Sequence, residues 1–331
     1  MQPNLSDITG RIFQIKTEKE FQELALEIFR FQSEENLIYK KYIHQLGRDS
    51  SSVNTIEQIP FLPIEFFKAM SVMTSKSVPE IIFTSSGTTG AERSHHDVAD
   101  VTLYEKSFRN SFRLFYGNPT DYCILALLPS YLERQGSSLI YMMNDLIQKS
   151  GQVMSGFYLD NHDELAQTLL RLKDSGQKTI LLGVTFALLD FIEKHSMKFP
   201  DLVVMETGGM KGRRKEIIRE ELHAVLCHGF GVAKVHSEYG MTELLSQAYS
   251  SGDGIFKSPP WMRILFRDTN DPLNMIHGSQ TGGINVIDLA NIFSICFIAT
   301  QDLGKEHFDN NFEIFGRFDD SDIRGCNLMM G

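Results

Sequence analysis

Residues 81–90 read Ile-Ile-Phe-Thr-Ser-Ser-Gly-Thr-Thr-Gly, a short apolar run that passes directly into hydroxyl and glycine residues. The apolar run predicts a short strand, and the segment from Ser94 to Leu114 predicts a helix. A strand, a small-residue loop and a helix make a good anion cradle, because glycines let backbone N–H groups approach phosphates and hydroxyls add donors. On composition alone, a flexible surface turn is an equal alternative. The predicted phosphate loop comprises Thr84, Ser85, Ser86, Gly87, Thr88, Thr89 and Gly90.

Apolar runs and helical patterns alternate on the C-terminal side of this loop. Such alternation predicts crossover units on a largely parallel sheet, and hence an α/β fold. The predicted strands are 81–83, 123–128, 152–154, 179–182 and 202–206. The predicted helices are 94–114, 136–149, 162–175, 185–195 and 213–227.

The two ends of the chain have different patterns from this middle part. Helical spacing begins after Thr17 and again near Glu35, until Pro60 and Pro63 break it. Beyond residue 250 the pattern predicts strands at 261–266, 283–289 and 294–299. The predicted organisation is a helical region (1–77), an α/β core that binds nucleotide and acid (78–250), a β-rich module (251–315) and a hinge-like tail (316–331).

Composition and charge exclude several classes of protein. The 331 residues carry a formal charge of -10 and are 42% hydrophobic, which is typical of a globular protein and unfavourable for binding nucleic acid. No run approaches the roughly 18 apolar residues of a membrane span, and the N-terminus does not resemble a signal peptide. Four cysteines without CxxC spacing argue against disulfides or structural zinc and fit the cytoplasm.

A second chemical segment is His-Ser-Glu-Tyr-Gly-Met-Thr-Glu at residues 236–243. Tyr239 offers an aromatic face for a base, and Thr242 offers a hydroxyl for a phosphate. Glu243 offers a hard oxygen ligand suited to Mg²⁺ that bridges phosphates. Taken singly, these residues are as well explained as a loop tyrosine and a solvated glutamate.

Two further segments carry a carboxylate and a cation. Thr-Gln-Asp-Leu-Gly at residues 300–304 predicts Asp302 at a strand end, where it could accept hydrogen bonds from both ribose hydroxyls. Gly-Arg-Phe-Asp-Asp at residues 316–320 predicts Arg317 on a turn. Either segment alone is a commonplace turn.

In this order and spacing, the segments resemble the motifs of the adenylate-forming superfamily, which includes acyl-CoA synthetases and luciferases. The resemblance covers about residues 78–325 and implies the large N-terminal domain of that fold, without its C-terminal lid domain. The hinge-like tail is also similar to that of phenylacetate-CoA ligases. The segment 59–68, Ile-Pro-Phe-Leu-Pro-Ile-Glu-Phe-Phe-Lys, looks more like the acyl-protein synthetases of the LuxE type. The resemblance implies nucleotide-binding roles for Thr84–Gly90, Gly208, Gly209, Tyr239, Gly240, Asp302 and Arg317.

The same resemblance implies the reaction and its participants. ATP and Mg²⁺ would activate a carboxylic acid, expected to be a fatty acid, as an acyl-adenylate, with Thr242 and Glu243 catalytic. Arg93 stands where a lysine often follows the phosphate loop. The acyl group would then pass to a thiol, which could be Cys326 of this chain, CoA, or a carrier or reductase protein.

Three interpretations stay open at this stage. Cys326 could accept the acyl group, or it could be a small buried hydrophobic residue. The lysine that the superfamily carries in its lid has no counterpart up to Gly331, so either the minimal domain suffices, or a partner supplies the lysine, or the activity has decayed. The alternatives to ATP-dependent activation are an ATP-independent acyltransferase and a lidless nucleotide-binding subunit of a larger complex.

Overall fold

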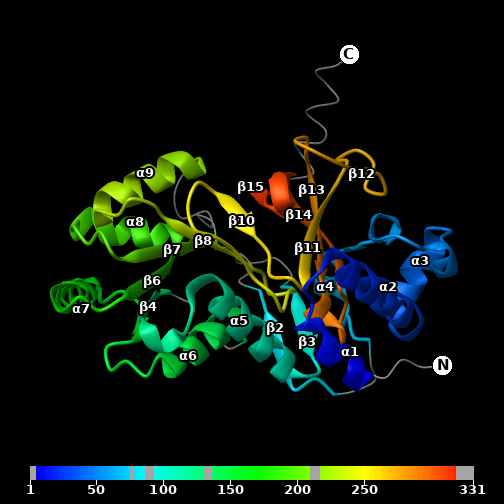
Figure 1. Cartoon of the computed structure of the whole chain (residues 1–331), viewed down its shortest axis with the longest axis horizontal. Helices are drawn as coiled ribbons and strands as arrows, with labels where there is room; N and C mark the ends of the chain where they lie inside the picture. The colour runs from blue at the N-terminus through cyan, green and yellow to red at the C-terminus, as the bar shows by residue number, and fades with distance from the viewer. Residues whose placement is uncertain (1–4, 75–77, 86–92, 130–135, 209–216, 318–331) are drawn as a thin grey trace, which may run out of the picture.

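The structure is a computed structural model that describes residues 5–74, 78–85, 93–129, 136–208 and 217–317. Most of its strands belong to one 13-stranded mixed sheet with the order β12-β11-β13-β14-β15-β10-β9-β8-β7-β6-β4-β5, in which β1 also pairs with β14. The sheet divides into a parallel half and an antiparallel half, which lie side by side in Figure 1. No helix of the described residues is long and apolar enough to cross a membrane.

The parallel half contains most of the strands and helices that the alternating pattern predicts, with the exceptions described below. Every residue of β4 and β6 is buried, as expected of strands covered on both faces. Its strands are β4 (Cys123–Leu127), β5 (Gly156–Tyr158), β6 (Thr179–Val184), β7 (Val203–Thr207) and β8 (His236–Tyr239). Its helices are α5 (Val101–Tyr116), α6 (Ser138–Ser150), α7 (His162–Ser175), α8 (Thr185–Lys194) and α9 (Arg219–Phe230).

The antiparallel half follows β8 along the chain. Hydrogen bonding continues without a break from β8 through β9 and β10 to β15, so the sheet runs across the predicted boundary at residue 250. The predicted domain boundaries remain predictions. The strands are β9 (Ala248–Ser250), β10 (Ile255–Lys257), β11 (Met262–Arg267), β12 (Met275–Ile276), β13 (Thr281–Asp288), β14 (Phe297–Glu306) and β15 (Phe312–Arg317).

The N-terminal helices pack against the antiparallel half, beside β11–β14 in Figure 1. α2 begins after Thr17, as the sequence predicts, and Thr17 and Glu20 form a capping box there. The buried Gln32 side chain on α2 donates to the carbonyls of Asn291 and Ile292, which fixes the helix to the sheet. The elements are α1 (Leu5–Ile12), α2 (Glu18–Glu35), α3 (Leu37–Gln45), β1 (Leu62–Pro63) and α4 (Phe66–Ala69). The short 3-10 turns are η1 (Ser50–Ser52), η2 (Ile56–Gln58), η3 (Pro119–Asp121), η4 (Leu289–Asn291) and η5 (Phe308–Asn310).

The predicted helix from Ser94 to Leu114 is wrong over its first residues. β3 (His95–Val98) pairs antiparallel with β2 (Ile81–Thr84) to form a separate two-stranded sheet. The helix starts only after Asp100, whose carboxylate accepts from the Thr102 N–H at 2.9 Å. Pairing with β2 outweighs the helical pattern here, because it satisfies the backbone groups of a segment that buries His96 and Val98.

Two other predicted elements are misplaced. The predicted strand at 152–154 is a turn with Val153 fully exposed, and the strand at this edge is β5, because Gly156 is the residue that pairs with Leu125. The predicted helix from residue 213 begins at Arg219, since residues 217 and 218 are not helical. Residues 213–216 lie outside the described residues.

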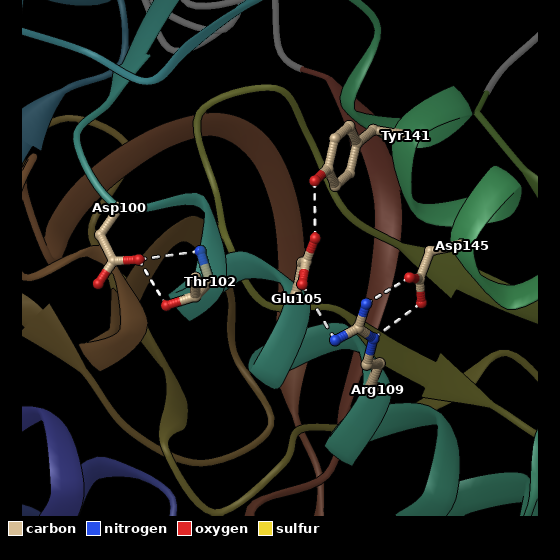
Figure 2. A network of polar contacts seen from close by, with 6 residues as sticks. All are labelled: Asp100, Thr102, Glu105, Arg109, Tyr141 and Asp145. Atoms are coloured by element: carbon tan, nitrogen blue, oxygen red, sulfur yellow. Dashed lines mark hydrogen bonds and ion pairs between the residues drawn. The ribbon is translucent and has the colours of Figure 1, made fainter. Parts of the chain in front are cut away.

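A polar network joins two helices of the parallel half, as Figure 2 shows. Arg109 on α5 makes a two-pronged ion pair with Asp145 on α6, with Nε 2.9 Å from Oδ2. Glu105 binds Arg109 at 3.0 Å and accepts from the Tyr141 hydroxyl at 2.8 Å. The network therefore fixes how α5 and α6 lie relative to each other beside the sheet.

Candidate functional site

The candidate site begins where the parallel strands β7 and β8 end. Residues of the two strands pair in register, with Glu206 beside Ser237 and Thr207 beside Glu238. Carboxyl ends of parallel strands are the usual place for ligands in open α/β sheets. Beside β8 the sheet changes from parallel to antiparallel pairing, since β8 pairs with β7 on one side and with β9 on the other.

Three predicted residues from separate segments meet beside this strand end. The Tyr239 hydroxyl donates to Asp302 Oδ2 at 2.7 Å, and Arg317 Nε lies 3.6 Å from Asp302 Oδ1. Asp302 and Arg317 face each other as register partners on β14 and β15. We call these three residues the Tyr–Asp–Arg cluster. The predicted positions at a strand end and on a turn are wrong: Asp302 lies within β14 and Arg317 ends β15, because both segments extend the sheet.

The electrostatics of the Tyr–Asp–Arg cluster favour a ligand. Burial raises the pKa of Asp302, against the opposing effects of the Tyr239 hydrogen bond and the Arg317 charge. Burial also holds the pKa of Tyr239 well above its usual range, so its hydroxyl keeps its proton and donates. The Arg317 side chain is 73% exposed, so this ion pair adds little stability and the guanidinium is accessible to another anion.

Thr242 and Glu243 follow β8 directly. Glu243 is only 5% exposed, and burial raises the pKa of its carboxyl while a hydrogen bond from Ser94 lowers it. The charge of Arg317 also lowers the pKa of Glu243, and a buried carboxylate of this kind can serve a cation as an oxygen ligand. Among the described residues no group of three or more His, Cys, Asp or Glu side chains could hold a metal ion. Any Mg²⁺ at Glu243 would therefore need further oxygen ligands, such as phosphates.

The structure describes only the first two residues of the predicted phosphate loop, Thr84 and Ser85. The Thr84 N–H donates to the Gly136 carbonyl at 2.7 Å, and the Ser85 N–H donates to the Ser94 carbonyl at 3.0 Å. Ser85 Oγ also accepts from the Ser94 N–H at 2.9 Å, which closes the loop's base. Arg93 is exposed. Ser86, Gly87, Thr88, Thr89 and Gly90 lie outside the described residues.

Of the predicted glycines Gly208, Gly209 and Gly240, the structure describes the first and the last. Gly208 follows β7 with a φ of 67°, and its carbonyl accepts from the Thr185 hydroxyl at 2.6 Å. Gly240 is closely covered, since a Cβ there would lie 2.4 Å from Glu238 Oε1. A side chain at either position is therefore disfavoured, for conformational reasons at Gly208 and for steric ones at Gly240. Gly209 lies outside the described residues.

Glu238 on β8 is a buried carboxylate for which the sequence predicted no role. It is 8% exposed and accepts a hydrogen bond from the Thr207 hydroxyl. Its charge contributes to the raised pKa of Tyr104 on α5 and of Tyr249 on β9. Burial raises its carboxyl pKa to about 7, against the opposing Thr207 hydrogen bond. A glutamate directly before Tyr239 was the available signal, but its burial follows only from the pairing of β7 with β8.

Two histidines near the motifs, His96 and His236, are buried or half-buried. His96 is fully buried, and burial lowers its pKa to about 4. Burial also lowers the pKa of His236 to about 4, and its Nδ1 lies 3.1 Å from the Tyr116 hydroxyl. Neither ring is therefore a cation near neutral pH.

The structure describes three of the four cysteines, Cys123, Cys227 and Cys296. Cys123 and Cys296 are buried and Cys227 is half-buried, and burial raises the pKa of all three thiols. None of these three is therefore activated as a nucleophile. Cys326 lies outside the described residues, so its predicted role as acyl acceptor stays a prediction.

Solved structures of adenylate-forming ligases share this fold. A 2-hydroxyisobutyryl-CoA ligase, in an open conformation with 2-HIB-AMP and CoA, is 13% identical with a TM-score of 0.65, over 92% of this chain and 72% of that one. ATP-bound MatB from Rhodopseudomonas palustris is 18% identical with a TM-score of 0.52, over 73% of this chain and 49% of that one. At these identities the likeness concerns the fold alone. The chain has the α/β fold of the large N-terminal domain of adenylate-forming ligases.

The family within that class follows from the sequence of almost the whole chain. Residues 12–331 match the family described as acyl-protein synthetase, LuxE, and the chain belongs to it. The resemblance inferred from the motifs is thereby confirmed. No curated protein sequence gives a significant match.

Proposed function

We propose that this protein activates a carboxylic acid with ATP and Mg²⁺ to an acyl-adenylate and then transfers the acyl group to a thiol. The observation that carries the proposal is the Tyr–Asp–Arg cluster, in which Tyr239 and Arg317 both contact Asp302. Membership of the acyl-protein synthetase family supports the same reaction class. We further propose a fatty acid as the substrate, on the resemblance to the LuxE type.

The Tyr–Asp–Arg cluster suits the nucleotide's ribose. Tyr239 donates to Asp302 Oδ2, and Asp302 Oδ1, which lies 3.6 Å from Nε of the accessible Arg317, would accept from the ribose hydroxyls. Burial strengthens such hydrogen bonds, because a carboxylate that loses water gains more from each donor. Gly208 and Gly209 would lie against the base, with the Tyr239 ring beside them.

The phosphates would lie between the predicted loop Thr84–Gly90 and Thr242, with Arg93 as an additional cation. Glu243 would hold Mg²⁺, which when bound neutralises phosphate charge and orients the oxygens. The chain's own contribution would be positioning of the phosphates by N–H groups, by hydroxyls and by the guanidinium of Arg93. Such preorganised charge stabilisation is the main need of this reaction class.

Both proposed steps balance. An oxygen of the substrate carboxylate attacks the α-phosphorus of ATP, the bond to the β-phosphate oxygen breaks, and pyrophosphate leaves. A thiolate then attacks the acyl carbon, the carbon–oxygen bond to AMP breaks, and AMP leaves. We propose Cys326 as this thiolate, with CoA or a carrier or reductase protein as further acceptors.

Acid-dependent exchange of labelled pyrophosphate into ATP, over a panel of acids of different chain length, tests the first step. We expect exchange with wild type and a loss of about 100-fold in Glu243→Gln, which keeps the shape but removes the charge. Glu220→Gln, an exposed glutamate on α9, is the matched control. No exchange with any acid contradicts the proposal.

Trapping of the acyl group tests the second step. With labelled acid and ATP, we expect a hydroxylamine-labile label on wild type and none on Cys326→Ser, while pyrophosphate exchange is kept. Label that appears equally on Cys326→Ser assigns the acceptor elsewhere. Label from acyl-CoA without ATP, together with no exchange, identifies an ATP-independent acyltransferase instead.

A further inference from the structure

Two consecutive carbonyls of the segment after β8 are bound by buried side chains. His96 Nδ1 lies 2.8 Å from the Thr242 carbonyl oxygen, and Asn291 Nδ2 donates to the Glu243 carbonyl oxygen at 2.8 Å. Both side chains are completely buried. A carbonyl bound in this way fixes the plane of its peptide unit, and two in succession fix the directions in which Thr242 and Glu243 point.

The two side chains come from distant parts of the sequence. His96 lies on β3, the strand that follows the predicted phosphate loop, and Asn291 ends the turn η4 in the antiparallel half. The next residues of the segment are held as well, since Asp288 Oδ2 accepts from the N–H groups of Leu245 at 2.7 Å and Ser246 at 2.9 Å. The segment after β8 is therefore held by hydrogen bonds from β3 on one side and from the antiparallel half on the other.

The His96 ring can act only in one protonation state. Because burial keeps its pKa at about 4, the ring is neutral near pH 7, and the proton is on Nδ1, facing the Thr242 carbonyl. The Phe67 ring packs edge-on against it, with ring centroids 5.5 Å apart, and fixes its orientation. Asn291 is anchored in turn, because Gln32 donates to its carbonyl at 3.1 Å.

We infer that His96 and Asn291 are positioning residues that hold Thr242 and Glu243 in the orientation that binds the metal–nucleotide complex. The inference rests on the proposed function and adds to it two fully buried residues that act through the carbonyls of Thr242 and Glu243. It also explains why a fully buried, neutral histidine follows the loop Thr84–Gly90. The hydrogen bond of His96 joins the hairpin that carries the loop to the segment that carries the proposed metal ligand, beside the hydrogen bond from Ser94 to Glu243.

Two variants of His96 test the inference. His96→Asn keeps an N–H donor near the position of Nδ1, whereas His96→Gln, which is also polar and neutral, places its amide near Nε2. We expect His96→Gln to weaken ATP binding in the presence of Mg²⁺ by about tenfold or more, as for other groups that orient metal ligands. His96→Asn should stay within about threefold of wild type. His95→Leu, which replaces the exposed neighbour on β3, should match wild type.

The measurement is calorimetric titration with ATP, with and without Mg²⁺. Only variants that show a cooperative unfolding transition, and are therefore folded, are titrated. Binding that weakens only with Mg²⁺ present, in His96→Gln and in Asn291→Leu, supports the inference. Equal loss with and without Mg²⁺, or equal behaviour of His96→Asn and His96→Gln, overturns it. If His96→Gln or Asn291→Leu does not fold while His96→Asn does, the role is structural and the inference also fails.

The two levels of the proposal can be separated. If wild type binds Mg-ATP but catalyses no pyrophosphate exchange, the proposed reaction fails while the binding test of His96 and Asn291 still stands. If wild type catalyses exchange and the variants match it in Mg²⁺ dependence and in KM for ATP, only the positioning role fails. We expect KM for the acid to be unchanged in every variant.

Discussion

The two halves of the large sheet are stabilised in different ways. In the parallel half, β4 and β6 are buried at every position and present almost continuous apolar side chains. In the antiparallel half, buried polar groups cross between strands: Arg267 on β11 donates to the Ile284 carbonyl at 2.7 Å, to Asn285, and to the Thr300 carbonyl on β14. The parallel half is thus a hydrophobic scaffold, and the antiparallel half carries much of the site's polar chemistry.

A glycine on β13 makes room for this polar network in the antiparallel half. Gly283 on β13 lies under the Arg267 side chain, and a Cβ there would be 2.7 Å from Cζ. The missing side chain lets the guanidinium cross β13 to reach Thr300, whose hydroxyl accepts from the Asp302 N–H at 3.1 Å. Asp302 of the Tyr–Asp–Arg cluster therefore rests on a polar network of the antiparallel half.

The largest expected effect comes from removing the Asp302 carboxylate, which links β14 of the antiparallel half to Tyr239 on β8. Asp302→Ala should lower kcat/KM for ATP by about a thousandfold, since two charge-assisted hydrogen bonds to ribose are worth about 4 kcal/mol together. Pyrophosphate exchange kinetics measure it. Asp309→Ala, in the η5 turn beyond the same strand, serves as control. A loss below about tenfold would place the ribose elsewhere.

The next effect concerns stability and tests whether the antiparallel half depends on its polar network. Arg267→Met keeps much of the apolar volume but leaves the bonded carbonyls of Ile284 and Thr300 without this donor. We expect a loss of about 3 kcal/mol in the free energy of unfolding. Urea unfolding followed by circular dichroism measures it. A loss under about 1 kcal/mol would mean that water replaces the guanidinium and that the two halves differ less than their hydrogen bonds indicate.

A pH dependence should distinguish Glu238, at the end of the parallel half. Burial raises its carboxyl pKa from 4.5 to about 7, so the folded protein binds this proton more tightly than the unfolded chain. Its protonated form favours folding below about pH 4.5, and that contribution is lost as pH rises towards and beyond 7. Relative to Glu238→Gln, wild type should lose about 2 kcal/mol of stability between pH 5 and pH 8. Parallel pH profiles of the two proteins would contradict the raised pKa.

The smallest effect belongs to the ion pair between α5 and α6 (Figure 2). Arg109→Met should cost about 1 kcal/mol, because the Arg109 and Asp145 side chains are 27% and 15% exposed and the pair is only partly screened. The exposed pair of Lys19 and Glu23, at 84% and 63%, is the control, and Lys19→Met should change little. Equal effects of the two substitutions in thermal unfolding would show that burial does not matter here.

Patterns of neighbouring residues correctly predicted the elements in which apolar residues recur at a regular spacing. The helix at 162–175 and the strand at 123–128 follow from apolar spacing, and the α2 cap follows from Thr17 and Glu20. The same reasoning failed at His95–Val98, which reads as the start of a helix but pairs with β2. It also failed at residues 152–154, where the apolar pair Val153 and Met154 is on the surface side of a turn. In both cases the partner strand, not the segment, decides the outcome.

For the candidate site, the sequence likewise indicated the residues but not their contacts. Tyr239, Glu243, Asp302 and Arg317 could be singled out from short motifs, because their residue types suit nucleotide and metal. Their contacts could not, since Tyr239 and Asp302 are 63 residues apart and meet only through the order of strands in the sheet. His96 and Asn291 had no usable signal, because their function lies in the carbonyls they bind.

The sequence by itself determined the alternating α/β pattern, the capped N-terminal helix, and the motifs by which the chain resembles acyl-protein synthetases, since these depend on neighbouring residues. The tertiary structure alone decided which polar groups are buried and whom they meet: Asp302 with Tyr239, His96 with Thr242, and Arg267 across Gly283. The physical reason is that burial makes an unpaired polar group costly, and only the folded sheet determines which groups lose water and which partners replace it.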